Sequence, residues 1–150
     1  MTSPARRRMS GIGLVLVAVY AIMALAASGR SFVQIVQRFD EAPVAYSLSA
    51  VSAAVYVLAT LALVFAGSRR WYVVASVAIA FELVGVLVVG TLSLLMPAVF
   101  QHPTVWSVYG YGYLFIPLVL PFVGLWWLRT HPPLGATTAA AAPDAAGARR

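Results

Sequence analysis

The chain has 150 residues, of which 62% are hydrophobic and only 9% are charged, and its formal net charge is +6. Soluble domains carry about 25% charged residues, so this composition predicts a membrane protein of one domain. The absence of cysteine excludes disulfides, thiol catalysis and thiolate metal sites. The arginines lie at the ends of apolar runs, which indicates topology anchors rather than a surface that binds nucleic acid.

Four apolar runs are long enough to cross a bilayer, which takes about 20 residues. They cover about residues 11–28, 43–66, 71–96 and 110–128. None alternates polar with apolar residues as the strands of a membrane barrel would, so each run is expected to be a helix. The predicted fold class is therefore all-α: a polytopic membrane protein with a four-transmembrane-helix bundle at 11–128 and short loops.

The first run, which follows a short N-terminal segment at 1–10, has two interpretations. Arginines, an apolar stretch and the small residues at 24–27 are also typical of a secretory signal. The apolar stretch exceeds the ~7–15 residues usual for a signal, so we expect it to be retained as a span. Next, residues 30–39 carry apolar side chains at helical spacing. They predict a short amphipathic helix on the outer leaflet, or an extension of the first span.

Arginine distribution predicts the orientation of the spans. Two arginines, Arg30 and Arg38, follow the first span, whereas eight lie on the side of the two termini. The positive-inside rule then places both termini in the cytoplasm and the protein in the plasma membrane. The low-complexity tail at 129–150 is expected to be disordered. Phe100, Trp106 and Tyr109 are interpreted as part of an aromatic belt at the outer interface.

Glu82 is the single charged residue in the third run, 71–96. At 100° per residue it shares a face with Ala75, Ala78 and Gly85, whereas branched apolar residues lie opposite. Small residues mark contacts between helices, so we expect Glu82 to face protein rather than lipid. A charge in the bilayer is unfavourable, so we also expect Glu82 to be protonated at pH 7 unless it borders water.

Glu82 has candidate partners in two other spans. Tyr20 in the first span and Tyr56 in the second fall near the same depth, and Ser52 shares a face with Tyr56. We predict an intramembrane polar cluster of Glu82, Tyr20, Tyr56 and Ser52. Such a cluster can hold the bundle together through hydrogen bonds. Alternatively, it can mark a pathway for protons or ions.

The fourth run contains Pro117 and Pro121, four residues apart. Each proline removes one backbone hydrogen bond, so we predict a helix kink near residues 116–120. The simpler role of this kink is in packing, and the alternative is a gating hinge.

No pattern indicates catalysis. His102 and His131 are predicted on opposite sides of the membrane, so they cannot share a metal or a haem. The spans hold no second acidic residue for acid–base chemistry, and no hydrolase, metalloprotease or phosphate-loop motif is present. We therefore predict no catalytic residue, cofactor or metal, and a protein that is not an enzyme.

Two stretches resemble a family of small actinobacterial integral membrane proteins of unknown function. They are GRSFVQIVQRFDEAPVAYSLSAVSAAVYVLATLAL and TVWSVYGYGYLFIPLVLPFVGLWWL, and the resemblance covers about residues 10–130. It implies an actinobacterial plasma-membrane protein with four spans, which agrees with an Arg-, Ala- and Gly-rich composition, and it implies no activity. The positions that carry it include Arg30, Gln34, Pro43, Trp106, Pro117 and Pro121.

The chain is also similar in architecture to the small multidrug resistance exporters, which are four-span proteins with one membrane glutamate. Their glutamate lies in the first span, whereas Glu82 lies in the third, so function does not follow. We expect an accessory or structural component of a cell-envelope process. Its partners would be the lipid bilayer and either further copies of itself or a larger membrane complex. The alternative is a small proton-coupled carrier or exporter that uses Glu82.

Overall fold

The computed structural model describes residues 11–133, and the predicted segment 1–10 and most of the predicted tail lie outside this range. The described residues form four α-helices and two short 3-10 helices, and none of them is in a strand. The predicted all-α class is confirmed. The helices are α1 (Ile12–Arg38), α2 (Pro43–Val64), α3 (Arg69–Leu95) and α4 (Ile116–Thr130), with η1 (Phe39–Glu41) and η2 (Ser107–Tyr113) between them.

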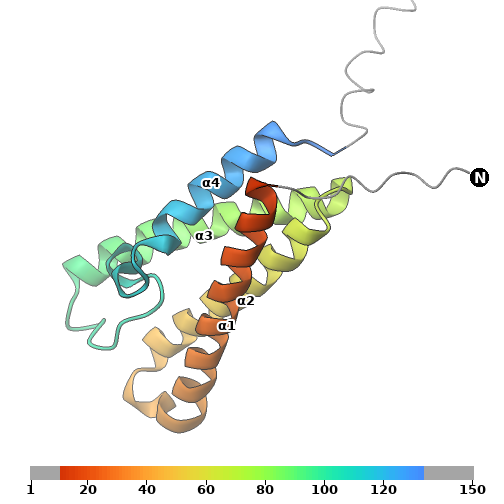
Figure 1. The fold of residues 1–150 in the computed structure, drawn as a ribbon. Helices are drawn as coiled ribbons and strands as arrows, with labels where there is room; N and C mark the ends of the chain where they lie inside the picture. Colours follow the sequence, from red (N-terminus) through yellow and green to blue (C-terminus); the bar gives the residue numbers. More distant parts are fainter. Residues whose placement is uncertain (1–10, 134–150) are drawn as a thin grey trace, which may run out of the picture.

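The helices pack in the order of the chain. α1 packs along α2, α2 packs against α3, and α3 packs along α4 and η2, whereas α1 and α4 touch little. Figure 1 shows α2 and α3 diverging from the short turn that joins them, so that these two helices form a V. Small residues on the buried face of α2 allow close approach to its neighbours. They are Ala45, Ser49, Ser52, Ala53, Ala59 and Ala62.

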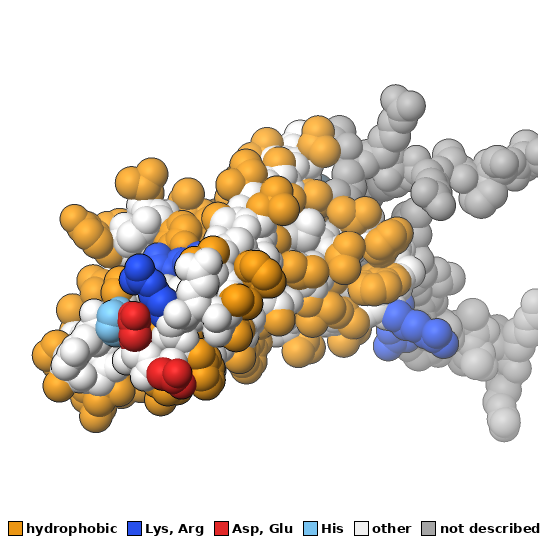
Figure 2. All heavy atoms as spheres, turned by 90° about the horizontal axis from the view of Figure 1, so that it is seen from below, with side chains coloured by type: hydrophobic (Ala, Val, Ile, Leu, Met, Phe, Trp, Pro, Cys, Tyr) orange, Lys and Arg blue, Asp and Glu red, His pale blue; other side chains and the backbone are white. Residues whose placement is uncertain are grey.

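Three helices, α1, α2 and α3, are long and apolar enough to cross a membrane. Charged side chains gather at the two ends of the molecule, with hydrophobic side chains between them (Figure 2). The η1 end carries Arg30, Arg38, Asp40 and Glu41. The opposite end, here called the turn end, carries Arg69, Arg70 and Arg129. These features describe a multi-pass membrane protein.

The first predicted span and the segment 30–39 form one helix. α1 continues without a break from Ile12 to Arg38, and only the next three residues, Phe39–Glu41, form a 3-10 helix before Ala42 leads into α2. Of the two interpretations of residues 30–39, a separate amphipathic helix or an extension of the first span, the structure therefore shows the extension. The apolar side chains of this extension, such as Phe32 and Val36, stay exposed.

The fourth predicted span, 110–128, is not a single helix. η2 and α4 meet at a bend of 98°. The bend lies at Leu114 and Phe115, which adopt left-handed backbone conformations with φ of 55° and 58°. The predicted kink within residues 116–120 is therefore wrong in its place, because a helix begins there. Pro117 lies in the first turn of α4, where its missing N–H has no helical partner to lose.

Pro121 lies inside α4, one turn after Pro117. Gly110, in η2, lets the chain fold back on the start of this helix. Its φ is +80°, and a Cβ at this position would lie 2.7 Å from the ring of Pro117. Pro117 thus starts a helix and supports a tight reversal before it, rather than bending a continuous span.

Candidate functional site

The site is a polar group in the middle of the bundle, centred on Glu82 of α3. Its side chain is completely buried, with 0% exposure. The Tyr20 hydroxyl of α1 donates a hydrogen bond of 2.7 Å to Glu82 Oε2. Tyr20 itself is 0% exposed, so the bond is shielded from both water and lipid. Glu82 thus faces protein, through a partner 62 residues away in the sequence.

Tyr56 of α2 lies beside this pair. Its ring centroid is 6.2 Å from that of Tyr20, and the two rings are tilted by 48°. The Tyr56 hydroxyl accepts a hydrogen bond of 3.3 Å from the indole Nε1 of Trp106. The cluster therefore draws on α1, α2, α3 and the loop of residues 96–106 that follows α3, here called the connecting loop.

Ser52, one turn from Tyr56, is also fully buried but does not extend the cluster. Its hydroxyl donates to the backbone carbonyl of Ser49 at 2.7 Å, within the same helix. A serine hydroxyl has one proton, which this bond uses. The structure thus brings together Glu82, Tyr20 and Tyr56, whereas the hydroxyl of Ser52 is bonded to its own helix.

Trp106 is the member that sequence reasoning missed. We interpreted it as part of an interfacial belt, and this was wrong, because it is only 2% exposed. The connecting loop carries it into the bundle over Gly85, where a Cβ would lie 2.7 Å from the indole ring. The small residue one turn above Glu82 is the signal in the sequence that a bulky group enters here.

Hydrogen bonds around Thr104 hold the loop in this inward conformation. The Thr104 Oγ1 accepts from the backbone N–H groups of Trp106 and Ser107, at 3.2 and 3.0 Å. The Ser107 hydroxyl accepts from the Thr104 N–H at 2.8 Å. These side-chain bonds replace helical ones and form a compact turn around the indole. At the outer edge of the loop, Arg30 donates to the Pro103 carbonyl at 2.6 Å.

The second carboxyl oxygen of Glu82 differs from the first. Among residues 11–133, Oε1 has no hydrogen-bond partner, although it is buried. The fourth side of the cluster is closed by α4, where a Cβ on Gly124 would lie 3.4 Å from the Tyr20 hydroxyl and 3.1 Å from Ile79. The arrangement is thus tight, and it contains one acceptor that is open to a proton or to a further donor.

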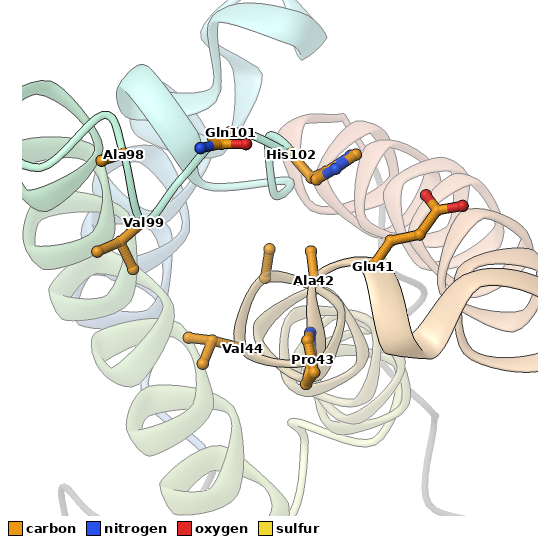
Figure 3. Close-up of a pocket in the computed structure, with 9 residues that line it drawn as sticks. Glu41, Ala42, Pro43, Val44, Ala98, Val99, Gln101 and His102 are labelled. Carbon is orange, nitrogen blue, oxygen red and sulfur yellow. The ribbon is translucent and has the colours of Figure 1, made fainter.

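Two hollows on the surface lie away from Glu82. One, of about 290 Å³, is at the η1 end between the start of α2 and the connecting loop. Glu41 and His102 lie on one side of it and Val44 and Val99 on the other (Figure 3). The Tyr46 hydroxyl, 3.4 Å from both Glu41 Oε2 and His102 Nδ1, links these two side chains. The other hollow, of about 540 Å³, runs between α2 and α3.

The described part of the chain contains no group of three or more His, Asp or Glu side chains that could hold a metal ion. His102 follows α3 near the η1 end, whereas His131 follows α4 at the turn end and stacks on Trp127 at 4.9 Å. Comparison of the chain with models of protein families, with curated proteins and with solved structures found no match.

Proposed function

We propose that this protein is a non-enzymatic integral membrane protein that serves as an accessory or structural component of a cell-envelope process. The observation that carries the proposal is the complete burial of Glu82, with Tyr20 bonded to it. A carboxyl group that binds a transported ligand must be reached from a water-filled path. Neither hollow in the surface is lined by Glu82. The polar cluster is therefore suited to holding four chain segments in one arrangement.

The outward surface supports the same proposal. Large apolar side chains are exposed on every helix, including Leu25 of α1, Val77 of α3 and Phe122 of α4. In a bilayer these faces meet lipid or other membrane helices. The arginine distribution favours the plasma membrane with both termini in the cytoplasm. The resemblance to small actinobacterial four-span proteins agrees with this role and adds no activity.

Gentle purification of the tagged, full-length protein from its native membrane tests the proposal. We expect one membrane protein to co-purify in a fixed ratio, or a defined homo-oligomer to appear. A Glu82→Gln variant should retain the same partner, because residue 82 lies in the core and not on the surface. An unrelated four-span protein with the same tag is the control for non-specific capture. A monomer without a partner contradicts the proposal.

A second candidate function is a proton-coupled carrier, and Oε1 of Glu82, which has no hydrogen-bond partner among residues 11–133, favours it. A buried carboxyl with one free acceptor can exchange a proton or meet a donor on a ligand once the aromatic cover opens. Tyr20 and Tyr56 would then be its hydrogen-bond neighbours. Reconstituted vesicles with a pH gradient test this candidate. Uptake or efflux that is lost in Glu82→Gln, while this variant keeps its fold, supports the carrier over the accessory role.

A further inference from the structure

An apolar groove runs between α2 and α3 on the outside of the bundle. Its volume is about 540 Å³, and all nine side chains that line it are apolar. Lining side chains such as Val51, Val77 and Phe81 are exposed, so the groove is open to the surroundings of the protein. Its walls include Val51, Ala54 and Leu58 of α2 and Val73, Val77 and Phe81 of α3.

The turn end of this groove is positively charged. Arg70 precedes Val74, Val77 and Phe81 by 4, 7 and 11 positions, which places it on the face of α3 that lines the groove. Arg69 precedes Val73 by one turn in the same way. Both arginines are exposed. Neither forms a side-chain hydrogen bond or an ion pair with the described residues 11–133, whose exposed acidic groups, Asp40 and Glu41, lie at the η1 end.

The dimensions of the groove match one leaflet of a bilayer. At 1.5 Å per residue, the α3 wall begins about 5 Å from Arg70, at Val73, and ends about 17 Å from it, at Phe81. One leaflet contributes about half of the ~30 Å hydrocarbon core. A chain that starts at the arginines and follows the groove therefore ends near the bilayer centre.

From the apolar walls, the pair of exposed arginines and this length, we propose that the α2–α3 groove is a binding site for an anionic phospholipid. One acyl chain lies in the groove, and the phosphate headgroup meets Arg69 and Arg70 at the turn end. Guanidinium groups bind phosphate through paired N–H donors. A zwitterionic headgroup adds a cation that the two arginines repel, so the site prefers an anionic headgroup.

Native mass spectrometry of the full-length protein in mild detergent tests this site. The protein is titrated with phosphatidylglycerol and with phosphatidylcholine that carry the same acyl chains. Each arginine near a membrane surface contributes a factor of about five in affinity for an anionic lipid. We expect Arg70→Gln to reduce the preference for phosphatidylglycerol by this factor. We expect the double variant Arg69→Gln/Arg70→Gln to remove most of it, with Arg38→Gln, at the opposite end of the molecule, as the matched control.

Filling the groove tests the acyl-chain part of the site. Ala54→Phe places a ring in the groove and should abolish retention of both lipids, whereas Ala26→Phe, on an exposed position of α1, should leave retention unchanged. If Ala54→Phe does not fold, Val77→Phe fills the groove from the other wall. Unchanged lipid retention in a folded groove variant overturns the proposal. A preference for phosphatidylglycerol that survives the loss of both arginines also overturns it. So does a dimer that is present in the unmodified protein and lost only in the groove variant, because the groove would then bind a second copy of the chain.

Discussion

Substitution of Tyr20 by Phe measures the bond at the centre of the bundle most directly. The change removes one oxygen and leaves the ring, so the packing of α1 against α2 is preserved. It also leaves Glu82 with neither carboxyl oxygen bonded, because Oε1 already lacks a partner among the described residues. The expected effect is therefore a loss of one hydrogen bond together with exposure of a buried acceptor to apolar surroundings.

The magnitude follows from these two effects. Interhelical hydrogen bonds in a bilayer contribute about 0.6 kcal/mol on average and about 1.7 kcal/mol at most. A buried acceptor left without a donor costs about 1–3 kcal/mol. The Tyr20–Glu82 bond is 2.7 Å long and fully buried, which favours the upper part of the first range. We expect Tyr20→Phe to lower the free energy of unfolding by about 2 kcal/mol.

Reversible unfolding in mixed micelles, with increasing sodium dodecyl sulfate and helicity as the signal, measures this loss. Tyr111→Phe is the matched control, because Tyr111 is 68% exposed and should change the free energy of unfolding by less than about 0.5 kcal/mol. A double-mutant cycle with Glu82→Leu assigns the effect to the pair. If Tyr20→Phe is as stable as the control, the hydrogen bond is not formed and the reasoning fails.

Three further predictions follow from the packing. Gly85→Ala should destabilise the protein by about 1–3 kcal/mol through overpacking against Trp106, whereas Gly29→Ala, which meets nothing within 4 Å, should not; thermal unfolding of both variants decides. Arg30→Gln should speed cleavage of the connecting loop by chymotrypsin, whereas Arg38→Gln should not; equal rates would show that the loop is held by other contacts. Intact-mass measurement should find α1 retained, since its loss removes one partner of the polar cluster, and a chain that starts after the first span would contradict this.

The sequence predicts the fold class and the side of α3 that Glu82 occupies. The fold class follows from hydropathy. Apolar runs of this length lie in lipid, where each backbone polar group must be hydrogen-bonded, and a helix satisfies these groups within itself. The direction of Glu82 follows from the small residues that share its face. The pairing with Tyr20 follows from equal depth, since two spans of similar length bring residues at equal depth to one level.

What the sequence does not predict comes from contacts that no local pattern records. Tryptophan is a residue type that is common at membrane interfaces. The hydrogen-bonded turn around Thr104, which the sequence pattern does not reveal, directs Trp106 into the bundle instead. The break at Leu114 and Phe115 is equally hidden, because neither residue favours a left-handed backbone. There, the tertiary contact between Gly110 and Pro117 overrides local preference.

The order of the polar groups along the chain bears on biogenesis. Tyr20 and Tyr56 are synthesised before Glu82, so both phenols are already available when α3 leaves the translocon. The carboxyl can then pass from one polar surrounding to another without a period in contact with lipid tails. Trp106 is synthesised last of the four, and its burial over Gly85 completes the cover of the polar cluster.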